Sequence, residues 1–291
     1  MGTPRFVDGI GAFADRYQGF ILDQWGVIHD GVEALPEAMA AILELKRRNK
    51  RLVVLSNSGR RAELNRKRLA AMGFNPALFE AVVTSGEAAW LHLKHRARAP
   101  WRDLGRKCLL FTIGGDLGVV EGLGLELVDT PEEADFLFVT GLEIPPRTLE
   151  EYEAVVRRAA TRGLPMLCSN PDRVAPVQGE LITAPGALAA LYEDLGGTVH
   201  YVGKPHAAIY GACLDALDGL DAAEVVAIGD SMEHDIKGAN GAGIASCFLT
   251  DGIHRTSFPP GASHAAILHE VEALATRHLA HPDWVARRLT W

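Results

Sequence analysis

The sequence has few cysteines, no long apolar run and no excess of positive charge. Its four cysteines, Cys108, Cys168, Cys213 and Cys247, lie far apart and form no C-x-x-C pair. This disfavours a disulfide framework or a zinc site and predicts four reduced, buried thiols. No stretch of about 18 uninterrupted apolar residues occurs, so no membrane helix is expected. The net charge of −8 argues against binding to nucleic acid or to an anionic membrane surface.

The acidic balance favours small molecules as partners. The amino-terminal residues show no charged segment followed by an apolar one, so we expect a cytoplasmic protein. The chain has 291 residues, of which 48% are apolar. That is enough for one large domain or two ordinary domains, each with its own core.

Short β-branched runs alternate with helical patterns along the chain, which predicts an α/β fold with a parallel sheet. The strands expected in the main sheet are 19–23, 51–56, 81–84, 198–202, 224–229 and 245–249. Helices are expected over 36–49, where Pro36 occupies a first-turn position, and over 60–72, which Gly73 ends.

A second set of elements suggests an inserted α/β domain. Its expected strands are 107–113, 135–140 and 165–169, with a helix over 148–162. We therefore expect a core made of residues 1–103 and 184–291, with the inserted domain over 104–183. Residues 251–291 are expected to be loop-rich and then helical around 265–279, and no role is assigned to them.

Polar residues stand at the carboxyl ends of the expected main-sheet strands, where α/β sheets open their ligand crevice. These residues are Asp23, Ser56-Asn57-Ser58, Lys204, and Asp230 with Asp235. Two carboxylates with a backbone carbonyl suit Mg²⁺, which prefers hard oxygen ligands. Hydroxyl, amide and ammonium groups can hold the oxygens of a phosphoryl group.

In this order, the segments resemble the four motifs of the haloacid dehalogenase (HAD) superfamily of phosphatases and related hydrolases. The long insert between the second and third motifs resembles the subgroup with an α/β cap at that place, which includes nitrophenyl, nucleotide and phosphoglycolate phosphatases. Asn170-Pro171-Asp172 also resembles that subgroup. The resemblance implies a Rossmann-like parallel-sheet core with an α/β cap, and it leaves a homodimer open.

The resemblance also implies roles for individual residues. Asp23 would be the nucleophile that forms an aspartyl phosphate, and Lys204 would neutralise charge on the nucleophile and the phosphate. Asp23, Asp230 and the backbone carbonyl of Trp25 would bind Mg²⁺. Asp235 would orient Lys204 or a metal-bound water. Contacts with the substrate would come from Ser56, Asn57 and Ser58 and, in the insert, from Asn170.

Trp25 departs from the family pattern. Phosphatases of the family have a second aspartate two residues after the nucleophile, where it acts as general acid and base. Indole has no proton that titrates near neutral pH. Because such catalysis contributes about 10²- to 10⁴-fold in rate, alkyl phosphates should be poor substrates, and aryl or acyl phosphates should be better ones.

Other residues near these motifs offer replacements for the missing acid, but each has a simpler structural interpretation. His29, Asp30 and Glu33 follow Trp25 closely, and there a turn is the favoured interpretation. His206 is a further candidate acid, and His234 is interpreted as a helix-start residue. Gly114–Gly118 lacks the full dinucleotide fingerprint and is interpreted as a tight turn.

We therefore predict a Mg²⁺-dependent HAD-like hydrolase that acts on a small phosphorylated substrate. One alternative is a phosphate-ligand binding protein or sensor that has lost turnover with Trp25. Another is chemistry at Asp23 that involves no phosphate, such as dehalogenation, against which the metal-like position of Asp230 counts.

Overall fold

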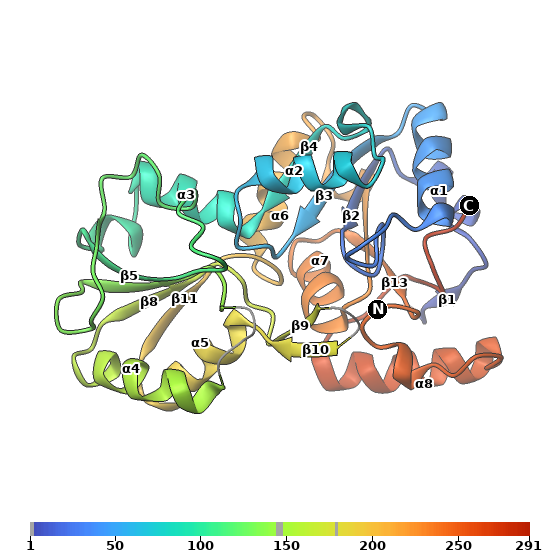
Figure 1. Cartoon of the computed structure of the whole chain (residues 1–291). Coiled ribbons are helices and arrows are strands. Elements are labelled where there is room, and N and C mark those ends of the chain that lie inside the picture. The colour runs from blue at the N-terminus through green and yellow to red at the C-terminus, as the bar shows by residue number, and fades with distance from the viewer. Residues whose placement is uncertain (1–2, 144–147, 178–179) are drawn as a thin grey trace. The chain divides into compact units, whose positions relative to one another are not determined.

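The computed structural model describes residues 3–143, 148–177 and 180–291. The chain forms two compact units, each with a parallel sheet flanked by helices (Figure 1). The first unit comprises Met1–Ser56, Arg66–Val83 and Lys204–Trp291, and the second comprises Asn57–Asn65 and Thr84–Gly203. The predicted α/β fold class, with Rossmann-like sheet topology, is confirmed.

The first unit contains a seven-stranded sheet with the order β1-β14-β13-β12-β2-β3-β4. Its strands are β1 (Arg5–Phe6), β2 (Gly19–Asp23), β3 (Arg51–Ser56), β4 (Ala81–Thr84), β12 (Val225–Gly229), β13 (Ala245–Leu249) and β14 (Trp284–Ala286). The successive pairings from β1 to β3 are all parallel. The sheet therefore aligns the carboxyl ends of β2, β3 and β12 at one edge.

Helices cover both faces of this sheet. They are α1 (Pro36–Arg47), most of α2 (Ala62–Ala71), α6 (Ala207–Ala216), α7 (Lys237–Gly241) and α8 (His264–His278). Short helical turns are Ile10–Ala12, Ala14–Arg16, Pro76–Leu78, Ala222–Glu224, the π-helical Met232–Ile236 and Arg255–Ser257.

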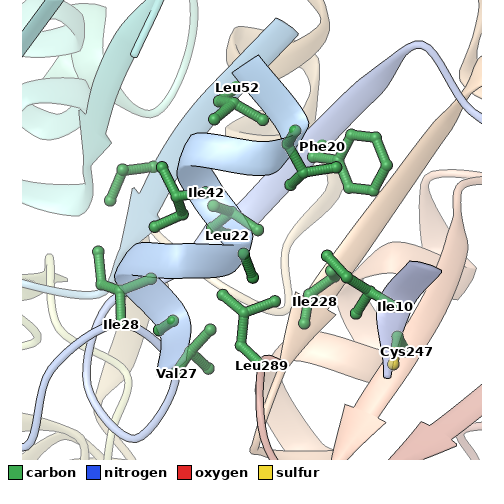
Figure 2. Close-up of a cluster of buried hydrophobic side chains, with 14 of the residues drawn as sticks. Ile10, Phe20, Leu22, Val27, Ile28, Ile42, Leu52, Ile228, Cys247 and Leu289 are labelled. Carbon is green, nitrogen blue, oxygen red and sulfur yellow. The ribbon is translucent and has the colours of Figure 1, made fainter. Parts of the chain in front are cut away.

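The two faces of β2 contribute to different cores. Phe20 and Leu22 pack with Ile42 of α1 in one cluster, part of which is shown in Figure 2. Ile21, which points to the opposite face, packs in a second cluster with Tyr210 of α6. A strand covered on both faces has a continuous apolar sequence, which is why β2 is easily recognised.

The carboxyl-terminal segment, for which the sequence predicts no role, contributes a strand to this sheet. Strand β14 lies between β1 and β13, and the backbone N–H of Thr250 donates to the carbonyl of Ala286. Asp251 also forms an ion pair with Arg288, with 3.0 Å between Oδ2 and Nε. The segment therefore holds the loop that follows β13.

The second unit contains a five-stranded parallel sheet with the order β11-β8-β7-β5-β6. Its strands are β5 (Lys107–Phe111), β6 (Glu126–Leu127), β7 (Phe136–Val139), β8 (Pro165–Cys168) and β11 (Thr198–Tyr201). Helices α4 (Leu149–Thr161) and α5 (Pro185–Asp194) cover one face, and α3 (Ser85–His95) covers the other (Figure 1). The unit also has a helical turn, Trp101–Asp103, and an antiparallel pair, β9 (Val174–Val177) and β10 (Glu180–Thr183).

The division of the chain differs from the expected one. The expected insert is 104–183, whereas helix α3, helix α5 and strand β11 all belong to the second unit. The segment at 198–202 was expected in the main sheet, but β11 pairs with β8. Periodicity identifies a strand without identifying its partner, and here Val199 and Tyr201 pack against the second unit's core.

All four cysteines are buried and free, as predicted. Burial raises the pKa of the Cys108 thiol to about 12, so this thiol stays protonated and inert at neutral pH. Among the helices in the described ranges, none combines the length and apolar character needed to span a bilayer.

Candidate active site

Asp23 ends the buried strand β2 and lies beside Lys204. The Lys204 ammonium donates to Asp23 Oδ1 at 2.6 Å and to Asp235 Oδ1 at 2.7 Å. Lys204 is 3% exposed, so this ion pair is shielded from water. Burial raises the pKa of the Asp23 carboxyl to about 7, while the positive charge of Lys204 partly opposes that rise.

Asp230 follows β12 and is enclosed by backbone. Its Oδ2 accepts a hydrogen bond from the Ile253 N–H at 2.8 Å. A Cβ added to Gly26 or to Gly252 would lie 2.1 Å or 2.0 Å from the same oxygen, so both positions require glycine for close approach. Burial raises the pKa of the Asp230 carboxyl well above its usual value, and the nearby carboxylates of Asp23 and Asp235 raise it further.

Asp235 lies in the π-helical turn after β12, and both of its carboxylate oxygens are hydrogen-bonded. Oδ1 accepts from Lys204, and Oδ2 accepts from the Ser231 N–H at 3.0 Å. A Cβ on Gly229 would lie 2.2 Å from the Asp235 carboxyl carbon, so the turn packs directly on the strand end. These contacts suit a residue that orients Lys204.

The three carboxylates could hold a metal ion. Asp23, Asp230 and Asp235 each offer an oxygen, and these oxygens lie within 4.8 Å of one another. Within the described ranges, no other group of three or more histidine, cysteine or acidic side chains has this geometry. Asp230 and Asp235 are buried and Asp23 is partly buried. Three carboxylates beside one lysine leave an excess of negative charge, and an oxygen-only donor set matches Mg²⁺. The residues present therefore fit the expected cation.

Trp25 comes two residues after the end of β2, in the turn that also contains Gly26. Its indole Nε1 donates to the backbone carbonyl of Asp30 at 2.9 Å, and a Cβ on Gly31 would lie 3.1 Å from that nitrogen. The single polar hydrogen of the indole is thus used within the turn. The Trp25–Gly26 peptide is brought near Asp230 by the close packing of Gly26 on Oδ2.

The residues considered as replacement acids form turns. His29 is 3% exposed, its Nδ1 accepts from the Gly31 N–H at 3.0 Å, and burial lowers its pKa to about 4. Asp30 Oδ1 accepts from the N–H groups of Val32 and Glu33, both at 2.8 Å. The geometry matches the turn interpretation of this segment.

Three more segments have local structural roles. His206 precedes α6 as its N-cap residue, and burial lowers its pKa. The backbone N–H of His234 donates to Ser231 Oγ at 3.2 Å, as expected for a helix start. In the Gly114–Gly118 segment, Asp116 Oδ1 accepts from the Gly118 N–H at 2.9 Å, which forms the expected tight turn.

The predicted substrate-binding residues divide between the two units. Ser56 ends β3 in the first unit, whereas Asn57, Ser58 and Asn170 belong to the second. Ser58 Oγ accepts from Asn65 Nδ2 at 3.3 Å. Asn170 Oδ1 accepts from the Asp172 N–H at 3.1 Å and so shapes the turn after β8.

Sequence reasoning missed several residues that support the site. Gly252 and Ile253 confine Asp230 but lie in a segment interpreted only as loop. Ser85 and Asp172 hydrogen-bond to the Asn57 side chain, and of these only Asp172 carried a signal, as part of Asn170-Pro171-Asp172. Contacts of this kind join residues that are distant in sequence, so no local pattern reveals them.

Known proteins resemble the chain over most of its length. Family models described as haloacid dehalogenase-like hydrolase match residues 20–126 and 104–243, and one described as HAD-hydrolase-like matches 201–290. The sugar-phosphatase AraL of Bacillus subtilis (strain 168) is 30% identical, over 80% of this chain and 83% of that protein.

Two solved structures have the same fold along nearly the whole chain. A hydrolase of the haloacid dehalogenase-like family from Brucella suis 1330 superposes with a TM-score of 0.82 at 26% identity, covering 97% of this chain and 99% of that chain. The p-nitrophenyl phosphatase from Archaeoglobus fulgidus superposes with a TM-score of 0.67 at 27% identity, covering 94% and 97%.

Replacing Gly252 with alanine should weaken cation binding, because the new Cβ must displace the Asp230 carboxylate. We expect the Mg²⁺ concentration at half-maximal thermal stabilisation to rise at least about 10-fold, a loss of roughly 1.4 kcal/mol. Gly241→Ala is the matched control, since a Cβ there meets nothing within 4 Å. An unchanged Mg²⁺ midpoint in Gly252→Ala would contradict the role of close packing at Asp230.

His29 should make the protein less stable in mild acid. The unfolded chain takes up a proton on this residue near pH 6.5, whereas the folded chain does so only near pH 4. The free energy of unfolding should therefore fall as the pH is lowered between these values, by roughly 3 kcal/mol. Urea unfolding of His29→Gln should lack this component, while His269→Gln, at an exposed position, should retain it. Parallel pH profiles for the wild type and His29→Gln would refute this assignment.

Proposed function

The chain belongs to the haloacid dehalogenase-like hydrolases, and on that basis we propose that it is a Mg²⁺-dependent phosphohydrolase acting on a small phosphorylated metabolite. One observation carries the proposal: the Lys204 ammonium lies between the carboxylates of Asp23 and Asp235, with Asp230 beside them. The names of the sugar-phosphatase and p-nitrophenyl phosphatase relatives support a phosphate ester as the substrate.

In this mechanism, the Asp23 carboxylate attacks phosphorus, and the bond from phosphorus to the leaving oxygen breaks. Water then attacks the aspartyl phosphate, which releases phosphate and restores the carboxylate. Lys204 favours the ionised form of Asp23, against the effect of burial, and offsets the charge of the phosphoryl oxygens. Mg²⁺, held by Asp23, Asp230 and the Trp25 carbonyl, would supply further positive charge to those oxygens.

The remaining predicted residues would bind the substrate. Ser56 lies at the end of the strand next to β2, where its hydroxyl can donate to a phosphoryl oxygen. Asn57 and Ser58 continue the same segment with an amide and a second hydroxyl. Asn170 lies in the turn after β8 and is proposed to contact the rest of the substrate.

Trp25 favours substrates with good leaving groups. The indole cannot protonate a departing alkoxide, and its N–H already donates to Asp30. An aryl or acyl phosphate releases an anion that needs less protonation in the transition state. We therefore propose aryl or acyl phosphates as better substrates than alkyl phosphates.

Because Trp25 cannot act as a general acid, it also supports the alternative of a binding protein or sensor for a phosphorylated ligand. Such a protein needs the phosphoryl and metal positions but no general acid. It also has no need for a nucleophile, and Asp23, which accepts a hydrogen bond from Lys204, therefore favours the enzyme.

Release of inorganic phosphate from a panel of aryl, acyl, sugar and nucleotide phosphates tests the proposal. We expect Mg²⁺-dependent release that is lost in Asp23→Asn, because an amide cannot form the phosphoenzyme. Asp194→Asn, at an exposed position in the second unit, is the control. No release from any substrate, with phosphate binding retained, would favour the binding protein.

Trp25→Asp tests whether the missing acid limits turnover. Because aspartate can protonate the leaving oxygen, we expect turnover of an alkyl phosphate to rise about 10²-fold or more over Trp25→Asn. The asparagine variant removes the indole in the same way but supplies no acid, so it controls for lost packing. Equal rates in the two variants would mean that another group supplies the proton or that the reaction needs none.

A further inference from the structure

The segment Asn57–Arg61 packs against residues that follow strands β7 and β11 of the second unit's sheet. A Cβ on Gly59 would lie 1.8 Å from the carbonyl oxygen of Thr140, which follows β7. A Cβ on Gly203, which follows β11, would lie 2.6 Å from Asn57 Oδ1. These close approaches need glycine and leave the segment little freedom within this unit.

Within this unit, the side-chain amide of Asn57 is held at both ends. Its Nδ2 donates to Asp172 Oδ1 at 2.7 Å, and its Oδ1 accepts from Ser85 Oγ at 3.2 Å. Asn57 is 3% exposed, and Ser85 is fully buried. A carboxylate only accepts hydrogen bonds, so Asp172 determines which end of the amide carries the nitrogen.

Asp172 is itself fixed by backbone contacts. Its N–H donates to Asn170 Oδ1 at 3.1 Å, and its carbonyl accepts from the Gly186 N–H at 2.8 Å. A Cβ on Gly186 would lie 2.0 Å from the Pro171 carbonyl oxygen, so the first turn of α5 packs tightly on this loop. The loop therefore holds the Asp172 carboxylate in a fixed position beside Asn57.

We propose that Asp172 is a positioning residue that acts through Asn57. By accepting one N–H, it keeps the nitrogen of the amide, with its second N–H, in the orientation that can donate to a phosphoryl oxygen. If the amide rotated by half a turn, its carbonyl oxygen would take the place of the nitrogen and repel the anion. This inference depends on the proposed function in one respect, namely that Asn57 meets a phosphoryl group.

The orientation itself can be measured without any turnover. In the full-length ¹⁵N-labelled protein, the Asn57 side-chain resonances are identified by their loss in Asn57→Ala. We expect Asp172→Ala to shift them and to speed their exchange with water, and Asp172→Asn, which retains an acceptor oxygen, to restore much of the native pattern. Asp194→Ala is the matched control. Unchanged Asn57 resonances in Asp172→Ala would overturn the proposal.

Calorimetric titration with inorganic phosphate in the presence of Mg²⁺ tests the consequence. We expect affinity to fall about 10-fold in Asp172→Ala, but no further loss when the same change is made in Asn57→Ala. Additive losses would overturn the proposal, because Asp172 would then act independently of Asn57. If the wild-type protein bound no phosphate, the proposed function would fail, while the resonances of Asn57 would still decide whether Asp172 orients it.

Discussion

The buried ion pair of Lys204 with Asp23 and Asp235 is the interaction on which the acidic site depends. Because the ammonium is almost inaccessible to water, the loss of Lys204 would leave carboxylates buried and uncompensated, at a cost of roughly 3–5 kcal/mol. One lysine does not balance three acidic side chains. Burial is the main cause of the raised pKa values of Asp23 and Asp230, and the neighbouring carboxylates add to it. A divalent cation would offset this excess of negative charge.

The backbone around Asp230 constrains the position of its carboxylate as closely as side-chain contacts do for Asp23 and Asp235. Gly26 comes from the turn after β2 and Gly252 from the loop after β13, and both pack on the same carboxylate oxygen. Pairing of β14 beside β13 holds the second loop in place. The final strand of the chain thus supports an acidic residue that precedes it by more than fifty positions.

Membership of the hydrolase family is shown, and the assignment of the chain to this enzyme class is confirmed. Cation, phosphoenzyme, cytoplasmic location and homodimer stay predictions. The departure of Trp25 from the pattern of the family also stays a prediction. In the structure, the indole N–H of Trp25 donates to the Asp30 carbonyl within the turn. The local environments of His29 and Asp30 assign these residues to the same turn, so none of the three offers an evident acid.

The sequence alone determined the α/β class, most strands of the main sheet, the family and the candidate residues Asp23, Lys204, Asp230 and Asp235. Buried parallel strands and the motifs at their ends are local patterns, so they can be recognised from the sequence. Only the tertiary structure decided that β11 pairs with β8, that residues 84–103 and 184–203 belong to the second unit, and that Asp172 holds Asn57. Strand pairing and side-chain contacts depend on which apolar faces meet, and that depends on packing between distant segments.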